Sequence, residues 1–366
     1  MSLATFETHR AVGTRVAPTG RMNLAPVEEA TYILPVKASS PLPRADFTEY
    51  LRWLSSTLRE VIVVDASPDE VFAAHASEWG HLARHVPPDA KLLTPMGKVG
   101  NVLTAIGLAS CERLVIADDD VRYDRRSLTR LIAMLDEVDV ARPQNYFDPM
   151  PWHARWDTGR TLLNRMTGGD WPGTLAVRRS VLLASNGYDG NAMFENLELV
   201  RTVLAVGGRE ASCLDIYVLR RPSTARHFWS QRIRQAYDEF ARPLRLLIQL
   251  AVLPITVALI MRGHGVLVAS IGAGVVAVAE LGRRRAGGAR IFPISASFFA
   301  PAWLVERAVC VWLALLSRLF LGGIAYRGTV LKLAANPLRV LRARHRQVLE
   351  GGLRSAPDHT PRYRSA

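Results

Sequence analysis

The chain has 366 residues, 49% of them hydrophobic and 22% charged, so it is long enough for about two domains and too apolar to be a disordered protein. Its three cysteines, Cys111, Cys213 and Cys310, lie far apart and form no Cys-x-x-Cys pair, which excludes a disulfide scaffold and disfavours a structural zinc site. The net charge of +13 comes from residues 241–366, which hold 18 Arg or Lys and 4 Asp or Glu; because the rest is nearly neutral, we predict no nucleic-acid partner.

Residues 1–30 contain no apolar core segment, and their arginines are scattered among Thr, Pro and Gly. This pattern predicts a flexible N-terminal arm rather than a signal peptide. Ordered structure is therefore expected from Thr31 onward.

Between residues 31 and 240, strand-like and helix-like segments alternate. The predicted elements are the strands Tyr32–Val36, Val61–Val64 and Leu114–Ala117 and the helices Phe47–Leu58, Asn101–Ala109 and Ser127–Leu135. Such alternation predicts an α/β domain with a mostly parallel, Rossmann-like sheet covered by helices on both faces. Ligands of these sheets bind beyond the carboxyl ends of the strands, so the residues that follow each strand are the first candidates for a site.

The strongest chemical signal is the run Asp118, Asp119 and Asp120, which follows the strand Leu114–Ala117 directly. Strand alternation places Asp118 and Asp120 on one face, where two like charges require a cation or an exposed turn. A hard divalent ion, shared with substrate phosphates, would satisfy them. A solvated acidic loop would do so equally well, and the spacing alone leaves both interpretations open.

Two weaker signals also indicate contact with a ligand. Glycines on both sides of Lys98, just before the helix that begins near Asn101, let the backbone approach a phosphate at a helix N-terminus, and Lys98 adds a positive charge. Asp65 ends the strand Val61–Val64, where its carboxylate either contacts a base or ribose or caps the helix that begins near Ser67.

Two uncharged apolar runs, Leu246–Met261 and Gly265–Ala279, follow the α/β domain with only a short polar break between them. A membrane span needs about 20 apolar residues, which snorkelling of Arg245 and Arg262 would supply for the first run. Arginines also flank both outer ends, as the positive-inside rule expects of a hairpin over residues 244–281 with both ends in the cytoplasm. The alternative is a pair of buried core helices.

A third apolar stretch covers residues 300–325 but contains Glu306, Arg307 and Arg318. The two arginines fall on one helical face, so we predict an amphipathic helix in the membrane interface, with a third span as the alternative. We accordingly divide the C-terminal third into membrane-associated helices, residues 241–330, and a basic tail, residues 331–366, suited to anionic lipids.

Taken together, residues 31–330 resemble the family 2 glycosyltransferases with the GT-A fold. The nearest subgroup is the membrane-bound ceramide glucosyltransferase-like enzymes, with their bacterial hopanoid-type relatives. The segments that carry the resemblance occur in the family's order: Tyr-Ile-Leu-Pro-Val-Lys at 32–37, Val-Ile-Val-Val-Asp at 61–65, Lys-Val-Gly-Asn at 98–101, Asp-Asp-Asp at 118–120, Thr-Leu-Ala-Val-Arg-Arg at 174–179 and Gly-Tyr-Asp-Gly at 187–190.

The resemblance implies a role for each matching residue. It makes Asp65 the acid that contacts uracil, and Asp118 and Asp120 the first and last acids of the DXD element, which hold Mn²⁺ or Mg²⁺ at the donor diphosphate. The implied contacts to the nucleotide sugar come from Pro35, Asp65, Lys98, Asn101, Asp118, Asp119 and Gln231.

Two elements depart from the family pattern. Where the family has Glu-Asp with the Asp as general base, this chain has Glu195 and Asn196, and an amide cannot accept a proton at neutral pH. Glu195 is the natural replacement, with Glu198 as a second candidate; Glu195 would otherwise only cap its helix. Of the family's Gln-x-x-Arg-Trp, this chain keeps Gln231 and Arg234 but has Gln235 in place of the Trp; Arg234 would face the leaving diphosphate.

The sequence therefore predicts a membrane-associated inverting glycosyltransferase on the cytoplasmic face of the cell membrane. Its predicted donor is a nucleotide-diphospho-sugar, with a UDP-sugar preferred, and its predicted acceptor is the hydroxyl of a lipid or of another membrane acceptor. One alternative is a polyprenyl-phosphate glycosyltransferase, whose anionic acceptor needs no base. The other is a catalytically degenerate membrane protein that only binds a nucleotide sugar.

Histidine and tryptophan add two further expectations. His81 and His85 lie one helical turn apart without the glutamate of a zinc protease, so we expect an exposed pair. Trp152, Trp156 and Trp171, with His153, occur in the acceptor half, where packing is the simplest role and a sugar or lipid contact the alternative.

Overall fold

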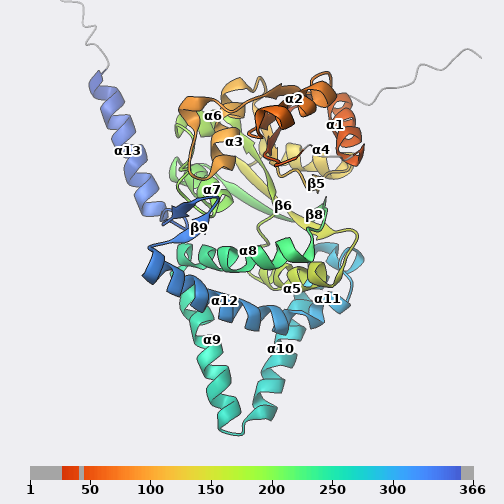
Figure 1. Ribbon diagram of the computed structural model, residues 1–366, viewed down its shortest axis with the longest axis vertical. Helices are drawn as coiled ribbons and strands as arrows, with labels where there is room; N and C mark the ends of the chain where they lie inside the picture. The colour runs from red at the N-terminus through yellow and green to blue at the C-terminus, as the bar shows by residue number, and fades with distance from the viewer. Residues whose placement is uncertain (1–26, 41–44, 356–366) are drawn as a thin grey trace, which may run out of the picture.

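The structure is a computed structural model that describes residues 27–40 and 45–355, with side chains up to residue 347. The predicted N-terminal arm lies outside the described residues up to residue 26, and so does the end of the predicted basic tail, residues 356–366. Figure 1 shows a sheet and its covering helices, with two long helices projecting from one end.

The centre of the molecule is an eight-stranded sheet in the order β3-β2-β1-β4-β7-β6-β8-β5. Neighbours β3, β2, β1 and β4 are all parallel, as are β6 and β8, whereas β7 and β5 are antiparallel to their partners. The predicted α/β class with a mostly parallel sheet is therefore confirmed. The strands are β1 (Glu28–Val36), β2 (Leu58–Asp65), β3 (Arg84–Val86), β4 (Arg113–Ala117), β5 (Val121–Arg122), β6 (Val140–Phe147), β7 (Thr174–Arg178) and β8 (Glu210–Arg220), with β9 (Ile324–Tyr326) and β10 (Thr329–Leu331) in a small second sheet.

Helices cover both faces of this sheet and continue beyond it (Figure 1). They are α1 (Ala45–Thr57), α2 (Asp69–Trp79), α3 (Gly97–Leu108), α4 (Arg125–Ala133), α5 (Trp152–Met166), α6 (Arg179–Ala184), α7 (Glu195–Ala205), α8 (Ala225–Tyr237), α9 (Pro243–Met261), α10 (Gly265–Arg284), α11 (Ser295–Phe298), α12 (Ala300–Leu321) and α13 (Leu338–Ser355). The 3-10 helices are η1 (Ala90–Leu92), η2 (Met134–Asp136), η3 (Asp238–Ala241) and η4 (Arg285–Arg290).

Strand β1 shows why the sheet is buried on both sides. Its side chains alternate between two apolar clusters, so that Ile33 packs with α3 residues such as Val102, while Leu34 packs with α1 residues such as Leu51. A strand covered on both faces reads as a continuous apolar run, which is the pattern that identified it in the sequence.

Helices α9 and α10 form the hairpin that projects from the body (Figure 1). The segments Pro243–Met261 and Gly265–Arg290 are each long and apolar enough to cross a membrane, by length and composition, and only 6% and 11% of their most apolar stretches are buried. This exposure contradicts the alternative of two buried core helices, because core helices lose their apolar surface to packing.

Helix α12 lies across the base of the hairpin and packs against α8, α5 and α9 (Figure 1). Its inner face buries Trp303, Arg307 and Val311, while its outer face exposes Leu319 and Phe320. A helix with one face packed on protein along its length is not a free-standing span, so the structure favours the amphipathic interpretation over a third crossing.

The hairpin base is joined to the sheet through one buried guanidinium. Arg165 on α5 donates to the carbonyls of Leu214, Gly282 and Arg285, which belong to β8, α10 and η4, and also to the Tyr217 hydroxyl. One side chain thereby joins the eight-stranded sheet to the C-terminal helices. The α/β domain and the helices predicted to be membrane-associated therefore share a core.

We expect Arg165→Met to lower the free energy of unfolding by about 3 kcal/mol or more, because each buried acceptor left without a donor costs about 1–3 kcal/mol. Thermal unfolding in detergent measures the change. The matched control is Arg130→Met, which removes an exposed ion pair with Asp215 and should cost less than about 1 kcal/mol. Equal effects of the two substitutions would mean that the hairpin base is not part of the folded core.

Candidate active site

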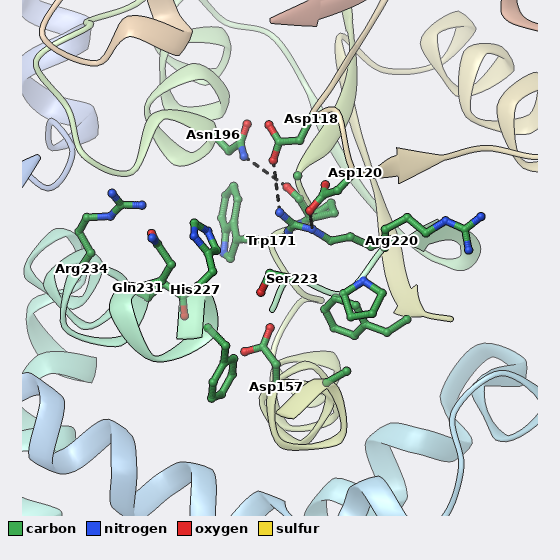
Figure 2. Close-up of a pocket in the computed structure, with 18 of the residues that line it drawn as sticks. Asp118, Asp120, Asp157, Trp171, Asn196, Arg220, Ser223, His227, Gln231 and Arg234 are labelled. Atoms are coloured by element: carbon green, nitrogen blue, oxygen red, sulfur yellow. Dashed lines mark hydrogen bonds and ion pairs between the residues drawn. The ribbon is translucent and has the colours of Figure 1, made fainter. Parts of the chain in front are cut away.

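One cavity of about 330 Å³ opens where β4, β8, α5, α7 and α8 meet. Figure 2 shows Asp118, Asp120 and Arg220 on one side of it, and His227, Gln231 and Arg234 from α8 on the other, with Trp171 between them. The cavity lies at the carboxyl end of β4, where the sequence predicted a ligand site.

The acidic run after β4 forms a tight turn that two neighbours hold in place. The Asp118 amide donates to the Gly173 carbonyl at 2.8 Å, and the Arg221 amide donates to the Asp120 carbonyl at 2.8 Å. Position 173 needs glycine, because a Cβ there would lie 2.3 Å from Asp118 Oδ2. The backbone thus fixes both carboxylates at the cavity wall.

Two basic side chains neutralise these carboxylates. Arg220 Nε lies 2.9 Å from Asp120 Oδ2 and its Nη2 lies 3.5 Å from Asp118 Oδ2, while Lys98 Nζ lies 2.6 Å from Asp118 Oδ1. Burial alone would lower the pKa of Lys98, but Asp118 and Glu195 raise it well above the usual lysine value. Lys98 therefore remains an ammonium ion.

The same lysine also contacts the start of helix α7. Lys98 Nζ lies 2.8 Å from Glu195 Oε1 and so bridges Asp118 to the first residue of α7. Glu195 and Asn196 both line the cavity, and the Asn196 amide donates to the Pro172 carbonyl at 3.3 Å. The residue predicted as base is thus present in the cavity with an ion pair already formed.

The carboxylates after β4 fit a hard divalent cation. Asp120 Oδ1 is buried without a hydrogen-bond partner, although Asp120 Oδ2 is paired with Arg220. Mg²⁺ and Mn²⁺ take oxygen ligands, and an unpartnered carboxylate oxygen beside a second aspartate offers them. Asp118 and Asp120 therefore have the donor set that the sequence predicted for a metal.

Helix α8 forms the opposite wall. Gln231 and Arg234 line the cavity, and the Arg234 guanidinium stacks 4.9 Å from the centre of the Tyr326 ring. Asp157, from α5, also lines the cavity, and there Arg160 and Arg232 lower its pKa below the usual range although burial opposes them.

Glu198, the second candidate base, lies outside the cavity. Its side chain is buried, and its carboxylate accepts hydrogen bonds from the Asn336 backbone amide and from Asn336 Nδ2 at 2.6 and 2.8 Å. Residues three apart on a helix usually share a face, but here α7 is packed on several sides, so Glu195 and Glu198 meet different neighbours.

Five residues predicted to bind the nucleotide sugar do not line this cavity: Pro35, Asp65, Lys98, Asn101 and Asp119. Lys98 contacts the lining residues Asp118 and Glu195 from behind the cavity wall. Asn101 Nδ2 donates to the carbonyls of Val36 and Val64 at the ends of β1 and β2, and so ties two strand ends together. Asp119 lines a neighbouring cavity with Asp46 and Arg221. The nucleotide contacts of these five residues stay predictions.

Asp65 belongs to a buried hydrogen-bonded cluster. His75 Nδ1 and His85 Nε2 lie 2.7 and 3.1 Å from Asp65 Oδ2, and the Ser67 amide donates to Asp65 Oδ1 at 2.9 Å. Burial would raise the pKa of Asp65, but the hydrogen bonds from His85, Ser67 and His75 lower it below the usual range. The expectation of an exposed histidine pair is wrong for His85, whose side chain is 2% exposed because it packs between Phe72 and Trp79.

The ligand atoms of Asp65, His75 and His85 lie within 4.8 Å of one another, as in a metal site. However, His85 Nδ1 is buried without a partner, whereas a metal-bound histidine usually donates its second N–H to a neighbour. The distances to Asp65 are those of hydrogen bonds. The cluster is therefore better described as a hydrogen-bonded triad.

Several cavity residues were missed by the sequence analysis: Asp157, Arg220, His227 and Asp238. Arg220 could have been found, because it ends an apolar strand, and strand ends were the places to search. Asp238 could also have been found, because it lies four residues after Arg234 on the same helical face. Asp157 carries no local signal. Trp171 and His153, for which a ligand contact was the alternative to packing, both line the cavity.

No family model matches the chain, and no curated protein sequence matches it. Among solved structures, it is similar to a mannosyltransferase from Pyrobaculum calidifontis in complex with GDP-Man and Mn²⁺, with 19% identity, coverage of 79% of this chain and 88% of that one, and a TM-score of 0.45. It is also similar to mannosyl-3-phosphoglycerate synthase from Rubrobacter xylanophilus (15% identity, 56% and 70% covered, TM-score 0.39) and to glucosyl-3-phosphoglycerate synthase from Mycobacterium tuberculosis (17%, 54% and 74%, TM-score 0.37). With TM-scores below 0.5, none of these likenesses assigns an activity to this chain.

We expect Asp65→Asn to lower the free energy of unfolding by about 1–3 kcal/mol, the usual cost of weakening hydrogen bonds to a buried charged acceptor. Thermal unfolding with and without UDP measures both stability and nucleotide binding. Asp215→Asn, at an exposed carboxylate, is the matched control. If the Asp65 variant keeps its stability but loses UDP binding, the uracil contact is its role and the structural one is refuted.

Proposed function

We propose that the protein is a membrane-associated inverting glycosyltransferase of the GT-A type, similar to the family 2 enzymes and their ceramide glucosyltransferase-like subgroup. It would transfer a sugar from a nucleotide-diphospho-sugar, most simply a UDP-sugar, to a lipid hydroxyl. The observation that carries the proposal is the cavity at the end of β4, where Asp118, Asp120, Glu195, Gln231 and Arg234 converge although they are far apart in sequence.

The two walls of the cavity suit the two halves of the reaction. Asp118 and Asp120 would hold a divalent metal, which supplies positive charge to the diphosphate of the donor. Arg234 and Gln231 on α8 would bind the leaving diphosphate by charge and hydrogen bonding. The acceptor hydroxyl would lose its proton to a carboxylate on the opposite side of the sugar, a role for which the sequence offers Glu195.

The hairpin supports the membrane part of the proposal. Helix α9 has 19 residues and α10 has 20, so at about 1.5 Å per residue each is close to the roughly 30 Å thickness of the hydrocarbon core. Arginines lie at the hairpin base, including Arg245, Arg283 and Arg284, and favour a cytoplasmic base. The exposed face of α12, beside that base, would rest in the interface.

An aromatic cluster links this interface to the cavity and supports a lipid acceptor. Phe228 lines the cavity and contacts Trp152 and Trp229, and Trp156 connects Trp229 to Phe299 at the start of α12. Trp152 and Trp229 are 45% and 47% exposed. Amphipathic rings of this kind favour the membrane–water boundary and would line the path of a lipid headgroup.

The metal assignment predicts that Asp120→Asn lowers transfer about 100-fold or more, because one hard oxygen charge opposite the diphosphate is lost. EDTA should have the same effect on the wild type, and added Mn²⁺ or Mg²⁺ should restore activity. The measurement is incorporation of labelled sugar into extracted lipid, with UDP-sugars and GDP-mannose as donors. Full activity in EDTA would refute the metal.

The membrane assignment predicts that Ile255→Glu with Ile271→Glu releases the protein from membranes washed at high salt. Both side chains are at least half exposed, so in water the charges cost little, whereas in a bilayer each costs about 2.5–3.5 kcal/mol. Leu93→Glu with Leu183→Glu, at exposed positions of the α/β domain, is the control and should stay bound. If the hairpin variant still sediments with membranes, the hairpin is not the anchor.

A further inference from the structure

The acceptor side of the cavity contains a second carboxyl group, on helix η3. Asp238 follows α8 directly and lines the cavity together with Gln231, Arg234 and Gln235. These four residues have the spacing i, i+3, i+4 and i+7, which places them on one helical face. Asp238 therefore faces the same space as the residues proposed to bind the donor diphosphate.

Asp238 differs from the other carboxylates of the cavity in having no ionic partner. Asp118, Asp120, Asp157 and Glu195 are each paired with a lysine or arginine at 3.1 Å or less. Asp238 forms none of the ion pairs found among the described residues, and its Oδ1 is buried without a hydrogen-bond partner. A buried acceptor without a donor is costly, so an unpartnered carboxyl oxygen at a cavity marks a place where a ligand hydroxyl can bind.

Building on the proposed glycosyltransferase function, we infer that Asp238, rather than Glu195, takes the proton from the acceptor hydroxyl. In this step the acceptor O–H bond breaks and its proton passes to Asp238, while the acceptor oxygen bonds to the anomeric carbon. The bond from that carbon to the diphosphate oxygen breaks, and the nucleoside diphosphate leaves with the electron pair. Glu195 instead positions Lys98, the ammonium ion that it shares with Asp118.

Burial makes Asp238 a stronger base than an exposed aspartate. Burial, opposed by Arg242 and assisted by Glu195, raises the pKa of Asp238 to about 8. The charged groups that act on Asp238 come from the elements packed around it. Glu195 lies on α7, Arg234 on α8 and Glu239 on η3, while Arg242 follows η3 and Arg307 lies on α12. Glu195, in contrast, is bonded to Lys98, which must be displaced before its Oε1 can accept a proton.

The test compares Asp238→Asn with Glu195→Gln in membranes containing the full chain, using labelled UDP-sugars and GDP-mannose as donors and endogenous lipid as acceptor. Asp238→Asn should lower kcat by about 10²–10⁴-fold, the usual contribution of a general base, with little change in donor KM. The wild-type kcat/KM should rise with pH to a midpoint near 8. This dependence should disappear in Asp238→Asn but persist in Glu195→Gln, with its midpoint moved to lower pH because the charge of Glu195 is lost.

Stability gives a readout that does not need activity. The folded pKa of Asp238, about 8, is above its unfolded value of about 4, so the folded state binds the extra proton between these values and wild-type stability falls as pH rises from 4 to 8. Asp238→Asn mimics the neutral acid and should fold. As the pH rises from 4 to 8, the melting temperature of this variant should rise relative to that of the wild type. Asp215→Asn, at an exposed carboxylate, should show no such gain.

The outcomes separate the two proposals. A wild type that transfers sugar and an Asp238→Asn variant with the wild-type rate and pH profile would refute the role of Asp238 and leave the glycosyltransferase intact. A wild type that transfers no sugar from any donor would refute the proposed function, and the role of Asp238 with it. If the melting temperature of Asp238→Asn does not rise relative to that of the wild type between pH 4 and 8, the raised pKa of Asp238 is contradicted.

Discussion

Five carboxyl groups surround one small cavity, and the repulsion among them is the constraint on which the rest of the site depends. Four of them are stabilised by buried or half-buried cations: Lys98, Arg220, Arg160 and Arg232. These cations come from α3, β8, α5 and α8, so neutralising the cavity requires every wall to be in place. An isolated charge in such a setting would be expensive, which explains why each cation bridges two acidic groups where it can.

Helix α8 shows how this constraint extends to the C-terminal helices. Its one face supplies Gln231 and Arg234 to the cavity, while Arg232 faces away and pairs with Asp157 and with Glu306 on α12. The charge of Glu306 was one reason to doubt a third membrane span. In the structure, this carboxylate forms an ion pair with Arg232. Because a single arginine joins a cavity carboxylate to α12, the helix in the proposed interface is also part of the support of the site.

Much of the fold could be predicted from the sequence, because parallel strands buried on both faces read as apolar runs and β1, β2 and β4 are of this kind. The same logic located Asp118 and Asp120, since a carboxylate that follows such a strand lies at a ligand-binding edge. Asp65 satisfies the same pattern but lies in a histidine cluster. That outcome depends on where α2 and β3 carry His75 and His85, and a strand-end pattern contains no information about neighbours brought by tertiary packing.

The two acceptor-side carboxyl groups show why residue type alone did not identify the proton acceptor. Glu195 stands where a family pattern expects a catalytic acid or base, yet its place opposite Asp118 gives it a lysine partner, Lys98. Asp238 matches no family motif, but its burial without an ionic partner among the described residues favours the neutral form and gives its anion a greater affinity for protons. The proposed inverting displacement would need ionised groups beside the diphosphate and a proton acceptor on the opposite side. The cavity would meet this need because Lys98 and Arg220 lie at the acidic turn after β4, whereas Asp238 at the end of α8 forms none of the ion pairs found among the described residues.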